Sequence, residues 1–349
     1  MKILITGNMG YVGPSVVSQL RTSYPDAILI GLDMGFFAHC LTHVKLLPET
    51  YLNQQIFADV RNVTAEMLKD VYAVVHLAGI SNDPMGNAFE EVTNEINCQA
   101  SIQLAQFAKE VGAQRFIFAS SCSIYGFADD TPRKENDKLN PLTAYARSKI
   151  GAEKGLAGLA NDNFVVTCLR FATACGMSSR LRLDLVVNDF VAIAIASNKI
   201  EMLSDGTPWR PLIHVEDMAR AIDWGVSRGV DNGGSFLAVN AGSDEWNYQV
   251  KELAACVAKV IPGVKMSINQ DAAPDKRSYK VDFAKFRGLA PKYQPQIDLE
   301  NTVRGLKEGL EAMNFKNSDF RNSEFMRLKV LTGFLERNQI DKNLKWVLD

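Results

Sequence analysis

The sequence predicts an α/β fold, a Rossmann-type doubly wound parallel sheet with a smaller, mixed α/β lobe toward the C-terminus. Two observations predict it. Short, continuously apolar segments alternate with amphipathic segments through the first half of the chain, and a glycine-rich turn joins the first apolar segment to the first amphipathic one. Continuously apolar strands separated by helices are typical of a parallel sheet that is covered on both faces.

The elements of the first half follow from their periodicity. Short apolar runs predict strands, and apolar residues that recur every three or four positions predict helices. In chain order, the predicted strands are residues 2–6, 27–32, 73–77, 115–119 and 164–170, and the predicted helices are residues 12–22, 94–111 and 143–160. The second half is less regular, with helical patterns at residues 185–197, 216–225, 248–260 and 299–313.

Composition excludes several classes of protein. The 349 residues include 38 Lys and Arg against 40 Asp and Glu, a net charge of −2, so no general positive field is available for nucleic acid or an anionic membrane. The six cysteines form no CxxC pair and have no zinc-ligand spacing with the four histidines, so we expect no metal and a reduced, cytoplasmic setting. The apolar runs are too short to span a membrane.

The glycine-rich turn predicts a dinucleotide site. Gly7, Gly10 and Gly13 lie where one glycine makes the turn, one admits a pyrophosphate and one lets the helix pack closely, with Tyr11 and Val12 between them. The N-terminus of the following helix attracts phosphates. The order of strand, glycines, helix, strand and acid argues against the alternative, a turn that binds nothing.

Asp33 sets the choice of cofactor. It ends the second predicted strand, 20 residues after Gly13, where a carboxylate accepts from the ribose hydroxyls and repels a 2′-phosphate. No arginine follows it directly, so NAD is predicted rather than NADP. Further cofactor contacts are expected at two places, near the adenine and beneath the pyrophosphate; these residues are Asp59, Val60, Leu77, Ala78 and Gly79.

A second motif predicts acid–base chemistry. Tyr145 and Lys149 are four apart at the start of a predicted helix and therefore share a face. The pKa of a free phenol is near 10, and an ammonium group and a positively charged nicotinamide ring nearby would favour the phenolate. Ser121 ends the strand 24 residues earlier, where its hydroxyl could bridge Tyr145 and a substrate oxygen.

With these motifs the chain resembles the extended short-chain dehydrogenase/reductase superfamily, in its NAD-dependent nucleotide-sugar epimerase/dehydratase branch. The resemblance covers about residues 1–312. It is carried by the glycine-rich turn, Asp33, the Asp59-Val60 pair, HLAG at 76–79, SSxxxYG at 120–126, YxxxK at 145–149, Leu169-Arg170 and RPLIHVED at 210–217. It implies that Tyr145 is the acid/base, that Lys149 also holds the cofactor ribose and that Ser121 contacts substrate. It further implies that Arg210 and Arg277 bind the phosphates or sugar of a nucleotide.

The chain departs from the pattern of this branch in the substrate region. Thr173 stands close to where many members have asparagine. Cys122 and Ser123, expected to face the substrate, replace the Asp-Glu pair of sugar-nucleotide dehydratases, which disfavours dehydration. The charged segment 178–184 either grips an anionic sugar or is solvated. Asn188 either donates to a diphosphate or is a polar residue on a helix face.

These features predict an enzyme with three parts. Residues 1–170 form the NAD-binding domain with the Ser, Tyr and Lys, residues 171–312 mainly bind substrate while some segments return to the sheet, and residues 313–349 form a helical tail with no assigned role. The expected activity is epimerisation of a nucleotide-sugar through a transient keto-sugar, with hydride returned from the cofactor. The alternatives are a dehydratase, a 4-keto-sugar reductase, which usually needs NADPH, and a non-catalytic NAD-binding module.

A homodimer is also expected, from two helices at residues 94–111 and 143–160. In the superfamily this pair forms a two-fold interface between subunits. Both helices carry small residues that would permit close approach, namely Ala100, Ala105, Ala108, Ala144, Ala146, Gly151 and Ala152.

Overall fold

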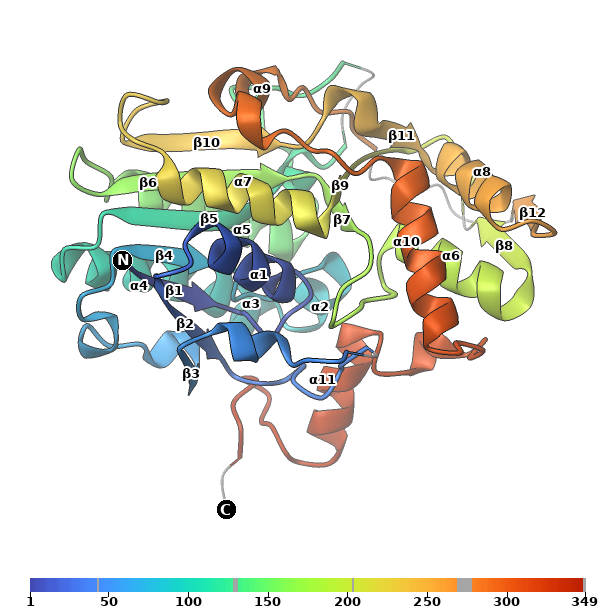
Figure 1. Cartoon of the computed structure of the whole chain (residues 1–349), viewed down its shortest axis with the longest axis horizontal. Helices are drawn as coiled ribbons and strands as arrows, with labels where there is room; N and C mark the ends of the chain where they lie inside the picture. The colour runs from blue at the N-terminus through green and yellow to red at the C-terminus, as the bar shows by residue number, and fades with distance from the viewer. Residues whose placement is uncertain (43, 128–130, 203, 269–277, 348–349) are drawn as a thin grey trace.

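Seven parallel strands form the central sheet of the molecule (Figure 1). The structure is a computed structural model that describes residues 1–42, 44–127, 131–202, 204–268 and 278–347. The order of the strands is β10-β6-β5-β4-β1-β2-β3. The strands are β1 (Lys2–Thr6), β2 (Ile28–Asp33), β3 (Gln54–Phe57), β4 (Ala73–His76), β5 (Arg115–Ser121), β6 (Val165–Phe171) and β10 (Phe236–Ala241). This order is the doubly wound arrangement with one added strand, so the predicted fold class is confirmed.

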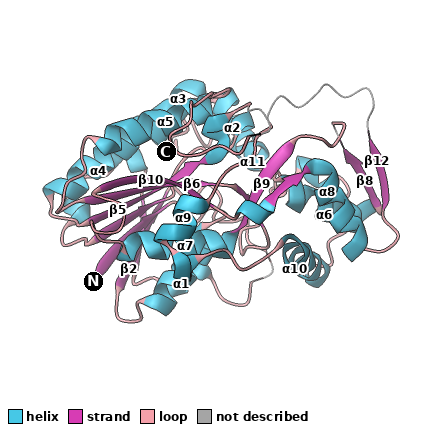
Figure 2. Ribbon diagram, turned by 90° about the horizontal axis from the view of Figure 1, so that it is seen from above, coloured by secondary structure: helices cyan, strands magenta, loops and turns pink. Residues whose placement is uncertain are grey.

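Helices cover both faces of the sheet (Figure 2). On one face lie α1 (Gly13–Ser23), α7 (Val215–Ser227) and α9 (Ala284–Leu289). On the other face lie α2 (Asp83–Ala88), α3 (Glu90–Asn94), α4 (Ala100–Glu110) and α5 (Ala144–Ala157). Strand β6, which lies between β10 and β5, is buried along its whole length because both of its faces are covered, and this explains its mostly apolar sequence, VVTCLRF.

The helix predicted at residues 94–111 is longer and less regular than expected. It begins at Glu90, and a π-helical turn, Glu95–Gln99, joins α3 to α4. Within this turn the fully buried Asn97 accepts from the Ile80 nitrogen at 2.8 Å and donates to the Ile80 oxygen at 2.9 Å. The irregular turn therefore fixes the loop that follows β4, which is a common use of π-bulges near functional sites.

The smaller lobe packs beside the C-terminal ends of the sheet strands. Its helices are α6 (Val186–Ser197), α8 (Val250–Val260) and α10 (Leu299–Ala312). Its strands form two small sheets, β7 (Thr173–Cys175) with β9 (Trp209–His214) and β11 (Asn247–Gln249), and β8 (Lys199–Met202) with β12 (Lys265–Ile268). The last helix, α11 (Arg327–Glu336), lies apart from this lobe in Figure 1, below the sheet. Among the described ranges, no helix is both long and apolar enough to cross a membrane.

The small residues of α4 and α5 pack against other residues of the same protomer. The six alanines named above are buried, and a Cβ atom on Gly151 would lie 2.8 Å from the sulfur of Cys98. These residues therefore allow close packing between helices of one protomer. The homodimer stays a prediction, and the small residues do not support it.

Candidate active site

One cavity of about 710 Å³ lies where the C-terminal ends of the sheet strands meet the smaller lobe. All of the predicted cofactor residues line it, from the glycine-rich turn and Asp33 to Tyr145 and Lys149. Of the predicted substrate residues, Ser121, Ser123, Thr173 and Arg210 line it as well. In open α/β sheets, ligands bind at this edge, so the site lies where the fold predicts it.

The glycine-rich turn fits a dinucleotide because there is no room for side chains. Gly7 has φ of +73°, and a Cβ atom there would lie 2.5 Å from the Ala78 nitrogen. A Cβ atom on Gly13 would lie 2.1 Å from the Asn8 oxygen. The turn thus closes tightly between β1 and α1, and its backbone forms the wall of the cavity.

Asp33 is held in place at the end of β2. Its Oδ2 accepts from the Met9 nitrogen at 3.0 Å, and its Oδ1 accepts from the Gly35 nitrogen at 2.8 Å. Burial raises the pKa of this carboxyl, and the two N–H donors lower it. A fixed carboxylate in the cavity wall, between the turn and Asp59, suits the ribose of a dinucleotide.

Lys149 occupies the buried first turns of α5, which Thr143 caps by accepting from the Ala146 nitrogen. Its Nζ donates to the Ala119 oxygen at 2.7 Å and lies 5.7 Å from the ring centre of Tyr145. Burial lowers the pKa of Lys149 to about 8, and Glu153 acts against this shift. Lys149 remains mostly protonated at neutral pH, with N–H donors available at the cavity.

Tyr145 is a neutral phenol in this environment. Burial raises its pKa to about 12, a hydrogen bond with Ser121 lowers it, and the charge of Asp83 raises it. Among the cations, Arg182 lowers the pKa of Tyr145 most. No feature of the sequence connects these two residues. Proton release from this phenol therefore needs additional positive charge in the cavity.

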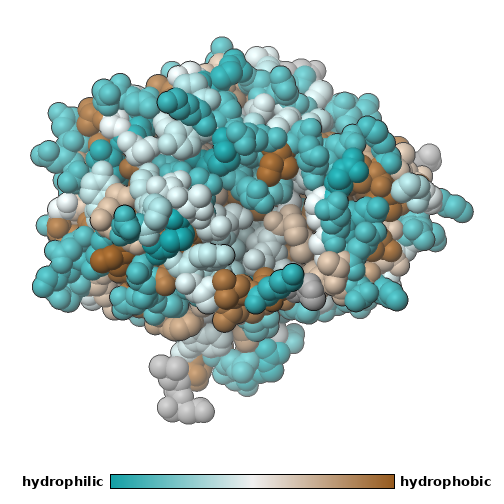
Figure 3. Space-filling model, viewed as in Figure 1, coloured by the Kyte–Doolittle hydropathy of each residue, from teal (hydrophilic) through white to brown (hydrophobic). Residues whose placement is uncertain are grey.

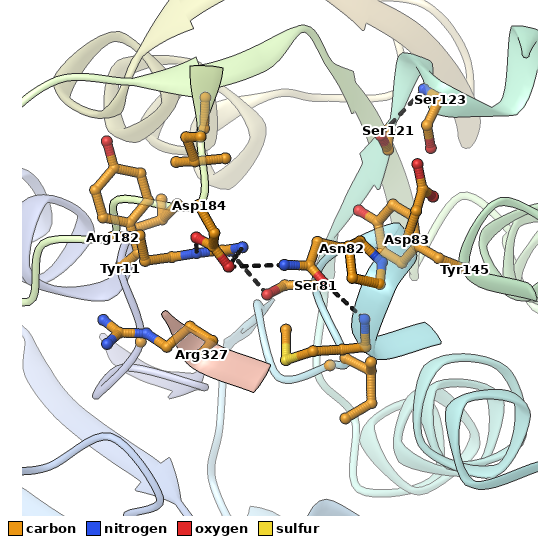
Figure 4. Close-up of a pocket in the computed structure, with 18 of the residues that line it drawn as sticks. Tyr11, Ser81, Asn82, Asp83, Ser121, Ser123, Tyr145, Arg182, Asp184 and Arg327 are labelled. Carbon is orange, nitrogen blue, oxygen red and sulfur yellow. Dashed lines mark hydrogen bonds and ion pairs between the residues drawn. The ribbon is translucent and has the colours of Figure 1, made fainter. Parts of the chain in front are cut away.

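Two segments meet beside this group (Figure 4): residues 81–83, which were not predicted to belong to the site, and residues 182–184 of the charged segment 178–184. The guanidinium of Arg182 donates to Asp184 Oδ1 at 2.8 Å and to Ser81 Oγ at 2.9 Å, and Asn82 Nδ2 donates to Asp184 Oδ2 at 2.8 Å. Asp83, the first residue of α2, accepts from Thr143 Oγ1 at 2.7 Å. The charged sequence of segment 178–184 was the signal that could have identified Arg182 as a site residue. Arg182 is buried in the cavity wall and is not solvated.

Two predicted substrate residues, Cys122 and Asn188, lie outside the cavity lining. The thiol of Cys122 is fully buried and donates to the Arg170 oxygen at 3.1 Å, and burial raises its pKa. Asn188 is also fully buried, and it donates to Arg182 O and to Tyr11 Oη. Neither lines the cavity, so both are corrected to structural roles. Arg277 lies outside the described residues.

Ser123 stays a predicted substrate residue. Its hydroxyl oxygen is buried and has no hydrogen-bond partner among the described residues, and Ser123 lines the cavity close to Ser121 (Figure 4). A buried hydroxyl without a partner carries an energetic cost that a bound ligand would remove.

The parallel sheet, the glycine-rich turn and the group of Ser121, Tyr145 and Lys149 define a short-chain dehydrogenase/reductase of the extended type. The family model described as the NAD dependent epimerase/dehydratase family matches residues 3–242. The chain belongs to this family, and its cofactor is NAD.

Relatives and solved structures agree with this membership. The uncharacterized UDP-glucose epimerase YtcB of Bacillus subtilis is 29% identical, over 64% of this chain and 71% of its own length. UDP-glucuronic acid decarboxylase 1 of Arabidopsis thaliana is 27% identical, over 92% of this chain and 70% of its own length. The structure of MoeE5 in complex with UDP-glucuronic acid and NAD has a TM-score of 0.76 at 24% identity, covering 89% of this chain and 99% of that one. This last likeness concerns the fold.

Proposed function

We propose that this chain is a nucleotide-sugar epimerase that acts through a transient keto-sugar. The observation that carries the proposal is the meeting of Ser121, Tyr145 and Lys149 in a cavity that runs from Asp33 to Arg210 in the smaller lobe. A proton relay of this kind has no purpose in a protein that only binds the cofactor. Relatives named as UDP-glucose epimerases support a nucleotide-sugar as the substrate.

Each residue of the group has a separate task. NAD, when bound, would supply an acceptor for a hydride from the sugar carbon and the donor for its return. Tyr145 Oη takes the proton of the sugar hydroxyl and later gives it back, and Ser121 Oγ holds the sugar oxygen beside Tyr145. Lys149 Nζ donates to the cofactor ribose and adds positive charge. Return of the hydride to the opposite face of the carbonyl would invert the configuration.

A dehydratase remains the second candidate because of Asp83. Elimination of water needs a base and an acid, and Cys122 and Ser123 cannot supply both. Asp83 lines the cavity and is close enough to Tyr145 to raise the pKa of its phenol. Its carboxylate is thus placed where it could remove a proton from a sugar held at Tyr145.

Product analysis separates the two candidates. We expect the purified protein, screened with UDP-, GDP-, CDP- and dTDP-sugars, to convert one of them into an isomer of unchanged mass. NMR would show inversion at one carbon, without solvent deuterium at that carbon because the hydride stays on the enzyme. A product lighter by one water would instead establish the dehydratase, and no turnover of any sugar would contradict both.

The fixed carboxylate of Asp33 predicts discrimination between the two nicotinamide cofactors. We expect NAD to bind at least about tenfold more tightly than NADP, about 1.4 kcal/mol, because Asp33 repels the 2′-phosphate. Calorimetric titration of both cofactors measures the ratio. In Asp33→Ala the ratio should approach one, whereas equal affinities in the unmodified protein would show that Asp33 does not contact the ribose.

A further inference from the structure

The C-terminal segment is anchored on the part of the sheet that surrounds Asp33. The indole Nε1 of Trp346 donates to the Met34 oxygen at 2.8 Å, and the ring centre of Trp346 lies 5.1 Å from that of Phe36 and 5.0 Å from that of Phe334. Arg61, beside Asp59, donates to the Asn343 oxygen at 2.8 Å. The chain thus leaves the smaller lobe and returns to the dinucleotide-binding half.

The same segment also reaches the cavity itself. Met326, Arg327 and Leu331, at the start of α11, line it together with Asp33 and the aromatic residues that follow β2. Leu331 packs in the apolar cluster that contains residues of β2, the loop after β3 and α4. The start of α11 therefore forms part of the cavity wall, and the contacts of Trp346 and Asn343 anchor the rest of the segment on the dinucleotide-binding half.

Arg327 brings a buried positive charge to this wall. Its residue exposure is 1%, and its guanidinium donates to the Arg180 oxygen at 2.8 Å and to the Glu324 oxygen at 3.2 Å. It also lies 4.7 Å from the ring centre of Phe37. Among the described residues, no carboxylate oxygen lies within 4 Å of it. Burial lowers its pKa to about 10, so it is charged at neutral pH.

The neighbouring charges do not neutralise Arg327. Arg180 is paired with Glu49 at 2.7 Å, and Arg182 is paired with Asp184 at 2.8 Å. Both arginines lower the pKa of Arg327 by repulsion, whereas the charge of Asp184, which Arg182 already binds, raises it. Figure 4 places Arg327 on the side of the cavity where Arg182 and Tyr11 lie, and Tyr11 belongs to the glycine-rich turn. Of these three arginines, Arg327 alone has no carboxylate partner among the described residues, and it lines the same cavity as the glycine-rich turn.

We propose that the C-terminal segment is part of the NAD site, and that Arg327 supplies the positive charge that this segment contributes to the phosphates of the dinucleotide. This inference rests on the assignment of NAD to the cavity. A buried cation without a carboxylate is costly, and a bound pyrophosphate would balance it. The segment would then hold the cofactor in place through many catalytic cycles, as an enzyme that returns its hydride requires.

Titration with NAD, ADP and adenosine tests the role of Arg327. In Arg327→Gln we expect the affinity for NAD and ADP to fall about tenfold to a hundredfold, because a charge-assisted hydrogen bond is lost. The affinity for adenosine, which has no phosphate, should change less than about twofold. Arg327→Lys keeps the charge and should recover part of the loss. Lys342→Gln removes an exposed charge from the same segment and should leave all three affinities unchanged.

A second variant covers the case in which Arg327→Gln does not fold. Trp346→Ala removes the anchor on Met34 without touching the cavity lining, and we expect NAD to dissociate about threefold faster or more when chased with excess ADP-ribose. Unchanged ADP affinity in Arg327→Gln, or an unchanged dissociation rate in Trp346→Ala, would overturn the inference. Failure of the unmodified protein to bind NAD or ADP would instead overturn the assignment of the cavity, and this inference with it.

Discussion

Tyr145→Phe is expected to lower turnover by about 10²–10⁴-fold, the usual contribution of a positioned acid–base group. The substitution removes one oxygen from a buried side chain and leaves the ring in place. Burial raises the pKa of the phenol to about 12, so Tyr145 begins protonated. The positive charge of the oxidised nicotinamide, with Arg182, would lower this pKa and allow the proton to move.

Single-turnover reduction of bound NAD by the substrate is the measurement that isolates this step. Tyr145→Phe should bind NAD with unchanged affinity and reduce it slowly. Ser121→Ala should lose less, since water can replace part of its hydroxyl, whereas Lys149→Met should lose both affinity and rate. If Tyr145→Phe reduces NAD as fast as the unmodified protein, Tyr145 is not the base.

The sequence was informative where the chemistry is local. The glycine-rich turn, Asp33 and the Tyr145–Lys149 pair lie within short segments, and each segment carries its own steric or electrostatic requirement. Their neighbours in the fold then follow from the parallel sheet, because all of its strands end at one edge. This is why the predicted fold class and the cofactor agree with the structure and the family.

The sequence was uninformative where contacts join distant segments. Strand β3 was not predicted because it is a short edge strand with the polar sequence QQIF, and β10, with the sequence FLAVNA at the opposite edge, was not predicted either. The contact between Arg182 and Ser81 spans 101 residues, and that between Trp346 and Met34 spans 312. The periodicity of a segment does not indicate which distant segment it contacts. Cys122 and Asn188 were misplaced because spacing alone does not tell which face of a turn or helix is buried.

The largest effect on stability is expected from Glu153→Ala, in the turn of α5 that follows Lys149. Glu153 and Arg170 form a buried pair, with side chains 7% and 8% exposed and Nη2–Oε2 at 2.7 Å, and Ser120 Oγ donates to Glu153 Oε1. Removing one partner leaves a buried charge without compensation, at a cost of about 3–5 kcal/mol. Urea denaturation would measure this loss, and Lys154→Ala, an exposed neighbour on α5, should change stability by less than about 0.5 kcal/mol.

Glu153→Ala is also expected to affect the active site, through the pKa of Lys149. Glu153 raises the pKa of Lys149, which burial lowers to about 8, so Glu153→Ala should lower the pKa of Lys149 further. The alkaline loss of NAD affinity should then begin at a lower pH than in the unmodified protein, because the neutral amine no longer attracts the cofactor as a cation. Replacing both partners, with Glu153→Leu and Arg170→Met, should recover much of the stability, since neither charge of the pair is then left without its partner. It should not restore the pKa of Lys149. A loss below about 1 kcal/mol in Glu153→Ala would show that water or another group compensates Arg170.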